Sequence, residues 1–251
     1  MKRLLILCLT CLPLLAPASS FAWGREGHEV VVRMALRLMK RSEQVKVYEL
    51  LGTHDWGEIG RWADSIRPHR PESEDRWHYV DIPATADAYD AARDCEPTCI
   101  IKELEHARAT VQNKNALRAE RKEALLFWLH LVGDLYQPFH CYNNNDRGAN
   151  TLVVIYHGHK RKMHQLWDAT IIKDKNPSAR SLASKIYRTH HYPASLPSLV
   201  EAANVSHARA LEALLKPGEK MNSKYLRHEW TVITRSLWEA ACLAAEIGAD
   251  I

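Results

Sequence analysis

The sequence predicts a mainly α-helical protein: a single compact multi-helix domain with long loops and at most a short β-hairpin. Apolar residues recur at helical spacing over most of the chain, as expected of helices that bury one face. Only residues 151–156 are rich enough in β-branched side chains to suggest a strand. The 251 residues also leave enough chain for one sizeable hydrophobic core after the first 22 are set aside.

Apolar periodicity predicts nine helical segments. In chain order they are 25–40, 43–52, 56–66, 98–113, 117–136, 163–173, 179–188, 196–215 and 222–248. The strand candidate is followed by His157 and Gly158, so it can pair with residues 159–163 as a short hairpin. Prolines mark loops at 67–74, 81–85, 174–178 and 192–198. No internal repeat or interdomain linker is present in the sequence.

The first residues have the composition of a secretory signal peptide. Lys2 and Arg3 precede an apolar stretch from Leu4 to Leu15, and small residues lead up to Ala22. About 12 apolar residues are too few for a membrane anchor, which needs about 20. We expect residues 1–22 to be cleaved, leaving a domain over 23–251 that is periplasmic or secreted. The net charge of +4 neither requires nor excludes a nucleic-acid partner.

Four cysteines remain after that cleavage, at positions 95, 99, 141 and 242. An even number in an oxidising compartment indicates two disulfides. A zinc ribbon is the alternative, but it requires paired CxxC motifs, and residues 23–251 contain none. Of the three possible connectivities we expect Cys95–Cys99 and Cys141–Cys242.

Two His-x-x-x-Asp pairs indicate metal binding. His130 and Asp134 lie four residues apart on a strongly apolar predicted helix, so both project from one face into the interior. A single such pair is more often a buried hydrogen bond than a metal site, because buried polar groups need partners. The spacing recurs at His164 and Asp168, however, and this repetition favours metal. Gly133 leaves room for another segment or a ligand to approach the first pair.

Four further candidate ligands lie near aromatic residues, and a mixture of imidazole and carboxylate suits zinc. They are His28, Asp64, His78 and His140. Gln137 and Pro138 end the helix that carries the first pair and place His140 just beyond it. The remaining histidines have no recurring partner and are expected at the surface or at helix caps.

The candidate ligands fall within an ordered set of motifs that resembles the class I, single-strand-preferring zinc-dependent nucleases of the mung bean nuclease type. The motifs are WGxxGH at 23–28, WADxxR at 62–67, WHYVDIP at 77–83, LHLVGDLYQPFH at 129–140, GAN at 148–150 and HQLWD at 164–168. The family is distantly related to zinc-dependent phospholipase C, and the resemblance implies a phospholipase C/nuclease-like helical fold. The usual GGN reads GAN here, which adds a methyl group at residue 149.

The resemblance implies three zinc ions as cofactors. One is held by Asp64, His78, His130 and Asp134; a second by His140, His164 and Asp168; and a third by Trp23, His28 and Asp134. Trp23 contributes its terminal amine and its carbonyl oxygen, and Asp134 bridges two ions. A terminal amine has the lone pair that a peptide nitrogen lacks, which explains why cleavage is expected before Trp23.

The implied activity is hydrolysis of single-stranded RNA and DNA to 5′-phosphorylated products, together with cleavage of 3′-nucleotides. Asp64 and Arg67 are the catalytic candidates, and Tyr79, Asp81 and Asn150 are the candidates for binding substrate. Two alternatives remain open: a phospholipase C-like phosphodiesterase and a non-catalytic exported zinc-binding protein. The oligomeric state does not follow from the sequence, and a monomer is the default expectation.

Overall fold

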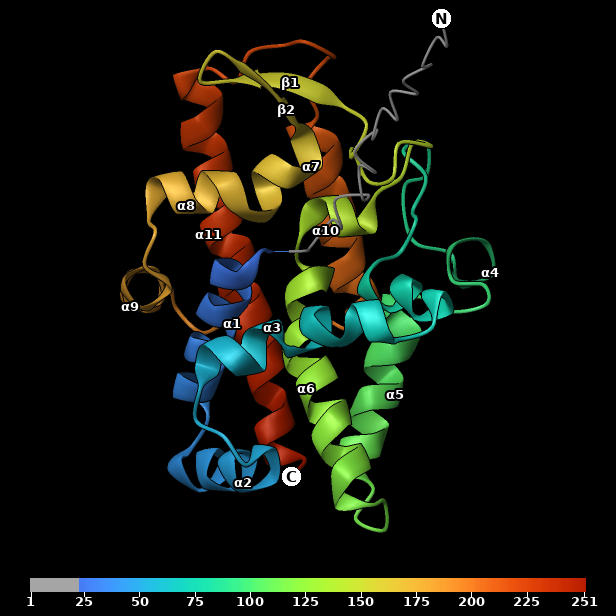
Figure 1. Ribbon diagram of the computed structural model, residues 1–251, viewed down its shortest axis with the longest axis vertical. Helices are drawn as coiled ribbons and strands as arrows, with labels where there is room; N and C mark the ends of the chain where they lie inside the picture. The colour runs from blue at the N-terminus through green and yellow to red at the C-terminus, as the bar shows by residue number, and fades with distance from the viewer. Residues whose placement is uncertain (1–22) are drawn as a thin grey trace, which may run out of the picture.

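Helix α6 (Arg118–Leu135) is the central helix of the fold. In the computed structural model, which describes residues 23–251, every side chain from Ala124 to Leu135 is buried. A helix that is apolar on all sides has to be enclosed by others. The helices that pack against it include α1 (Arg25–Leu38), α3 (Trp56–Ile66), α5 (Ile100–Gln112) and α11 (Ser223–Ala245). Figure 1 shows α6 in the middle of the molecule with α5 beside it.

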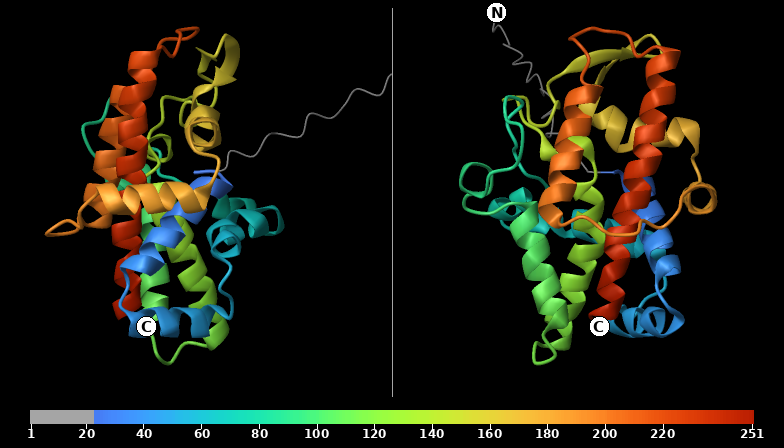
Figure 2. Two further views of the ribbon diagram at one scale, coloured as in Figure 1. Left: turned by 90° about the vertical axis from the view of Figure 1, so that its left-hand side faces the viewer. Right: turned by 180° about the vertical axis from the view of Figure 1, so that it is seen from behind.

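The other helices complete the enclosure. They are α2 (Arg41–Leu51), α4 (Ala91–Asp94), α7 (Met163–Gln165), α8 (Ile171–Lys175), α9 (Ala179–Thr189) and α10 (Leu199–Ala213). Short 3₁₀ turns, η1 (Arg67–His69), η2 (Glu72–His78), η3 (Pro138–Cys141) and η5 (Glu246–Ala249), connect or extend them. Each of the nine predicted helical segments contains a helix, so the mainly α-helical fold class is confirmed; α4 and η2 were not predicted. Figure 2 shows α10 and α11 running side by side behind α6.

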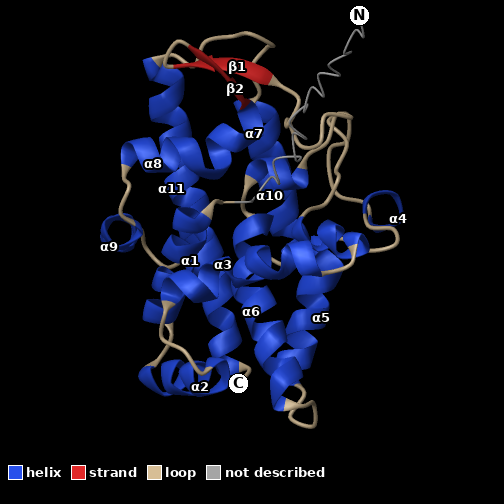
Figure 3. Ribbon diagram, in the orientation of Figure 1, coloured by secondary structure: helices blue, strands red, loops and turns tan. Residues whose placement is uncertain are grey.

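The predicted hairpin is present. Strand β1 (Val153–Tyr156) pairs antiparallel with β2 (His159–Lys162), with Val153 opposite Lys162. These are the only two strands in the described part of the chain, and both are red in Figure 3. All of β2 is exposed. It is the outer strand, because the other side of β1 is bonded to the loop before α11: Gly218 N–H donates to the carbonyl of Val153, and Ile155 N–H donates to that of Glu219.

The predicted helix over 163–173 is irregular. It runs as α7, then a π-helical turn, η4 (Leu166–Thr170), and then α8. A π turn accommodates one extra residue, and such turns are frequent at functional sites. Asp168 lies within the turn, and its carbonyl accepts a hydrogen bond from Gly24 N–H at 2.7 Å. The start of the described chain is thereby fastened to the second His-x-x-x-Asp pair.

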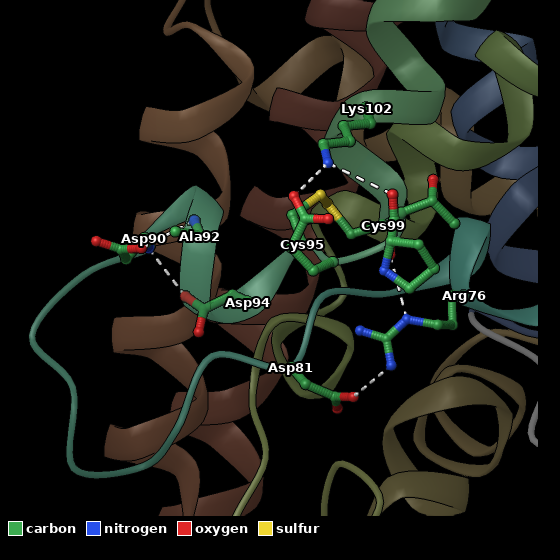
Figure 4. Close-up of a disulfide and its surroundings, with 11 residues drawn as sticks. Arg76, Asp81, Asp90, Ala92, Asp94, Cys95, Cys99 and Lys102 are labelled. Carbon is green, nitrogen blue, oxygen red and sulfur yellow. Dashed lines mark hydrogen bonds and ion pairs between the residues drawn. A yellow bond between two sulfur atoms is a disulfide. The ribbon is translucent and has the colours of Figure 1, made fainter.

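The cysteine prediction was half right. Cys95 and Cys99 form a disulfide, which Figure 4 shows at the start of α5. The predicted Cys141–Cys242 bond was wrong, because both residues are free, buried thiols. Cys141 donates instead to the carbonyl of Leu135 at 3.3 Å, and burial raises the pKa of both thiols, that of Cys242 to about 12. An even count of cysteines gives no information about which sulfur atoms meet.

The predicted signal peptide, residues 1–22, lies outside the described residues. Among residues 23–251, none of the helices has the length and apolar character that crossing a membrane requires.

Candidate metal centre and active site

Asp134, in the last turn of α6, lies at the centre of the site. Its Oδ1 is 3.1 Å from His28 Nε2, while its Oδ2 is 2.8 Å from His78 Nδ1 and 3.4 Å from His130 Nε2. Burial disfavours its charge, but the neighbouring His130 and His28 hold its pKa well below the usual range. The two oxygens of one buried carboxylate therefore face different sets of imidazoles, as a ligand shared between two cations does.

The predicted ligand side chains come together in three buried groups. Within each group, one ligand atom from every member lies within 4.8 Å of the others. The groups are His28, His130 and Asp134; Asp64, His78 and His130; and His140, His164 and Asp168. Helices α1, α3 and α6 with η2 build the first two groups, whereas η3, α7 and the π turn build the third. All eight His and Asp ligands predicted from the sequence are placed here.

Although His28 Nε2 and Asp134 Oδ1 are 3.1 Å apart, their geometry is not that of a hydrogen bond, and several of these buried atoms have no hydrogen-bond partner among the described residues. They are Nε2 of His28, His130, His140 and His164, Nδ1 of His28, and one oxygen each of Asp64 and Asp134. A buried polar atom is normally paired, so this concentration requires an explanation. Metal cations supply what these lone pairs lack, and an imidazole and carboxylate donor set suits zinc. The residues present fit metal ions.

Backbone carbonyls orient three of these imidazoles. Nδ1–H of His130 donates to the carbonyl of Gly60 at 2.7 Å, that of His140 to the carbonyl of His78 at 2.6 Å, and that of His164 to the carbonyl of Gly148. Each bond assigns a proton to Nδ1, so that Nε2 is the ring atom that faces the group. This pattern is typical of metal-bound histidine.

Protonation differs between the groups. Burial lowers the pKa of His140 to about 3 and that of His164 to about 4, so both rings are neutral and ready to coordinate. Burial also lowers the pKa of His28. Burial acts in the same direction on His130, but Asp134 and Asp64 outweigh it and raise that pKa to about 9. The carboxylates that favour a proton at His130 also favour a metal cation there.

Two glycines allow the close approach of ligands. A Cβ atom on Gly133 would lie 2.9 Å from His28 Nδ1, so the segment predicted to approach this glycine is α1 with its histidine. The rings of His28 and His130 stack with centroids 3.8 Å apart. At Gly148, φ is +64° and a Cβ would lie 2.4 Å from the carbonyl oxygen of Phe139, so only glycine fits there.

Gln137 holds the third group together and was missed as a functional residue. Its Nε2 donates to Asp168 Oδ1 at 2.6 Å, its Oε1 accepts from Phe139 N–H, and its side chain is completely buried. The other oxygen of Asp168 is 3.4 Å from His164 Nε2. Sequence reasoning recognised Gln137 only as part of a helix end; its position within the motif at 129–140 was the available signal.

Trp23 lies between the first and third groups. Its side chain is completely buried. A Cβ atom on Gly133 would lie 3.8 Å from Trp23 Cδ1 and 2.9 Å from His28 Nδ1, so both side chains lie close to this glycine. The next residue, Gly24, bonds to the carbonyl of Asp168. Whether the main-chain atoms of Trp23 bind metal stays a prediction.

Of the two catalytic candidates, Asp64 belongs to the second group, and Arg67 follows it at the end of α3. Asp64 on α3 has its Oδ1 3.6 Å from His130 Nε2. Arg67 follows one turn later, and its Nε donates to Asp75 Oδ1 at 2.8 Å. Asn150 donates to the carbonyl of Arg147 at 2.9 Å. Asp64 and Asn150 both line a cavity of about 760 Å³, which also reaches Asp168.

Tyr79 and Asp81 follow η2, and of the described residues neither lines that cavity. Both are half-buried, and burial raises the pKa of each. Sequence reasoning did not single out Arg76, which lies beside the candidate substrate-binding residue Asp81. Its NH1 is 3.9 Å from Asp81 Oδ2, and its Nε donates to the carbonyl of Thr98, in the loop closed by the disulfide (Figure 4).

Comparison with known proteins places this site in a family context. The family model described as "S1/P1 Nuclease" matches residues 23–247. Endonuclease 1 of Arabidopsis thaliana is 31% identical over 182 residues, which are 67% of this chain and 60% of the relative. Nuclease S1 of Aspergillus oryzae is 28% identical, covering 61% of this chain and 55% of the relative. Nuclease P1 of Penicillium citrinum is 25% identical, covering 73% and 74%. The match thus spans about 60% of the length of the plant relatives.

Proposed function

Because the chain belongs to the S1/P1 nuclease family, we propose that it is an exported zinc-dependent phosphodiesterase. It hydrolyses single-stranded RNA and DNA to 5′-phosphorylated products and also acts on 3′-nucleotides. The observation that carries the proposal is the three buried His/Asp groups, whose inward atoms lack hydrogen-bond partners in the described chain.

The residues assigned to three zinc ions are those that the groups contain, with Trp23 added. The assignment is Asp64, His78, His130 and Asp134 for one ion; His140, His164 and Asp168 for another; and Trp23, His28 and Asp134 for the third. When bound, zinc lowers the pKa of a water molecule from about 15.7 to about 7 and polarises phosphoryl oxygens. The position of Asp134 between His28 and His78 supports its sharing by two ions.

The chain's own groups then have separable roles. Asp64 orients the attacking water and accepts its proton. Arg67 stabilises negative charge on the phosphoryl oxygens, and Asn150 donates a hydrogen bond to the same phosphate. Tyr79 stacks on a base, and Asp81 accepts hydrogen bonds from the base edge. A stacking pocket favours the splayed bases of single strands over paired ones.

Trp23 is proposed as the amino terminus of the working enzyme. Its burial between His28 and Asp168, and a family match that starts at residue 23, support cleavage after Ala22. Its terminal amine then completes the ligands of the ion assigned to His28 and Asp134. A protein with one extra residue before Trp23 is expected to bind less zinc and to turn over substrate much more slowly than the protein that starts at Trp23; unchanged kinetics would contradict this role.

The central test is an assay of the protein starting at Trp23. Zinc content is measured alongside hydrolysis of single-stranded RNA, single-stranded DNA, adenosine 3′-monophosphate and lecithin. The proposal expects about three zinc ions and 5′-phosphorylated products, and Arg67→Ala is expected to retain zinc while losing at least tenfold in turnover. Release of phosphocholine with RNA left intact would indicate a phospholipase-like enzyme, and full zinc loading without any hydrolysis would indicate a zinc-binding protein.

A further inference from the structure

The cavity that reaches Asp64 and Asp168 is strongly basic; we call it the basic cleft. Of its fourteen lining residues, six are lysine or arginine: Arg25, Arg61, Lys160, Arg161, Lys162 and Lys173. Arg25 and Arg61 lie on the α1 and α3 side, and the other four lie on β2 and α8. The two carboxylates in the lining are both candidate metal ligands. Lys173 is paired with Glu26 at 3.5 Å, and one phosphate at Asp64 cannot contact the other five cations, which are spread over two walls.

Three of these cations belong to β2, which is joined rigidly to the metal centre. Lys162 is two residues before His164, and the intervening Met163 N–H donates to the carbonyl of Leu152 at 2.8 Å. At the other end of the hairpin, the Tyr156 hydroxyl donates to Asp174 on α8 at 2.8 Å. The loop before α11 holds β1 from its outer side. The basic strand is therefore fixed in position relative to the third metal group.

The charges on β2 are not neutralised locally. Among residues 23–251, no carboxylate lies within 4.0 Å of the charged groups of Lys160, Arg161 or Lys162, and all three side chains are exposed. Like charges on consecutive residues repel one another, so this arrangement favours an anionic partner. Lysines also protect exposed edge strands from aggregation, and that role is the competing explanation. It does not account for Arg25 and Arg61 on the opposite wall.

We propose that the basic cleft binds the sugar–phosphate backbone of a single-stranded polynucleotide on one side of the scissile bond. The inference rests on the proposed nuclease function and specifies what this cleft binds: several consecutive phosphates of one chain, which a mononucleotide does not supply. Tyr79 and Asp81 lie outside the cleft, so base recognition and backbone binding occupy different flanks of the metal centre. No aromatic side chain lines the cleft in the described chain. This flank therefore binds phosphates and does not discriminate between bases.

The test replaces three charges in the protein that starts at Trp23: Lys160→Gln, Arg161→Gln and Lys162→Gln together. The probes are a ten-nucleotide oligothymidylate and adenosine 3′-monophosphate. We expect KM for the oligonucleotide to rise at least tenfold, with a much smaller change for the mononucleotide, which reaches fewer of the cations. The slope of log(kcat/KM) for the oligonucleotide against log[salt] is expected to become shallower by up to about 2, since each contact with a single strand contributes about 0.7.

A matched control removes three exposed charges at the far end of the molecule: Arg41→Gln and Lys46→Gln on α2 and Lys122→Gln on α6 (Figure 1). It is expected to match the wild type on both substrates. A Lys160→Arg, Lys162→Arg variant, which keeps the charge, is expected to keep the oligonucleotide KM. Equal losses on both substrates, or a salt slope unchanged by the triple variant, would overturn the inference. Wild-type protein that hydrolyses neither substrate would instead refute the proposed function.

Discussion

The two His-x-x-x-Asp pairs share a spacing, but their surroundings hold them in different ways. His130 and Asp134 lie on a regular, fully enclosed helix, and Asp134 faces imidazoles from α1, η2 and its own helix. His164 and Asp168 lie on a short helix and a π turn, and Asp168 accepts a hydrogen bond from the buried amide of Gln137. Packing of long helices positions the first pair, whereas a π turn and a side-chain hydrogen bond from Gln137 position the second. Substitutions are therefore expected to affect the two pairs unequally.

The largest expected difference follows from replacing each carboxylate. Asp134→Ala is expected to remove at least two of the three zinc ions, because its oxygens face two ligand groups, and to lower activity at least a thousandfold. Asp168→Ala is expected to remove about one ion. Bound zinc measured by mass spectrometry, with circular dichroism to verify folding, distinguishes the two. Glu229→Gln, which changes a buried carboxylate outside the site, serves as the control. Equal zinc loss from both aspartate variants would refute the bridging role.

A second prediction concerns Gln137, on which only the second pair depends. Gln137→Met keeps a similar volume but removes the donor to Asp168, and loss of such a supporting contact typically weakens metal binding 10–100-fold. One zinc ion is expected to leave more readily in a chelator titration, while the ions at Asp134 stay. Gln44→Met is the control, since the side chain of Gln44, on α2, donates to the carbonyl of Met39 and belongs to none of the metal groups. Uniform weakening of all ions would show that Gln137 supports the fold and not one group.

The contrast between Asp134 and Gln137 also shows how far the sequence could be read. Helical periodicity and spacing were enough to predict α6 and the proximity of His130 to Asp134. They also predicted the proximity of His164 to Asp168, which holds although Asp168 lies in a π turn. The contact between Gln137 and Asp168 joins residues 31 positions apart and leaves no periodic trace. The separation of Cys141 from Cys242 likewise depends on packing, which a count of cysteines does not report. Lys160, Arg161 and Lys162 form a run of basic residues in the sequence, but the cleft that they line cannot be read from it.

A third prediction uses pH, because protonation separates the pairs in the metal-free protein. The pKa of His130 is raised to about 9, so its proton stabilises the native state below that pH, and this contribution is lost as pH rises from about 6.5 to about 9. The lowered pKa values of His140 and His164 act oppositely: as pH falls below about 6.5 the unfolded chain gains protons that the native state does not, and stability falls. Chelator-treated protein is therefore expected to have its highest melting temperature near pH 6.5.

Two variants test which histidines give rise to the acid and alkaline limbs of the plot of melting temperature against pH. His130→Gln is expected to flatten the alkaline limb and leave the acid limb in place. His159→Gln, at an exposed position on β2, is expected to leave both limbs unchanged. An acid limb that disappears in His130→Gln would show that the two pairs do not titrate separately.

The smallest expected effect concerns the turn that precedes the second pair. Ala149 has φ of +61°, a left-handed conformation that costs a residue with a Cβ roughly 1–2 kcal/mol, whereas glycine adopts it freely. Glycine loses about 0.5–1 kcal/mol more in conformational freedom on folding, so Ala149→Gly is expected to stabilise the protein by less than about 1 kcal/mol. The melting temperature should rise by about 1–3 °C. Gly148→Ala is the opposite case, because its Cβ would lie 2.4 Å from the Phe139 oxygen, and it is expected to lower both stability and zinc binding at His164. A lower melting temperature for Ala149→Gly would show that the buried methyl group contributes more by packing than the backbone conformation costs.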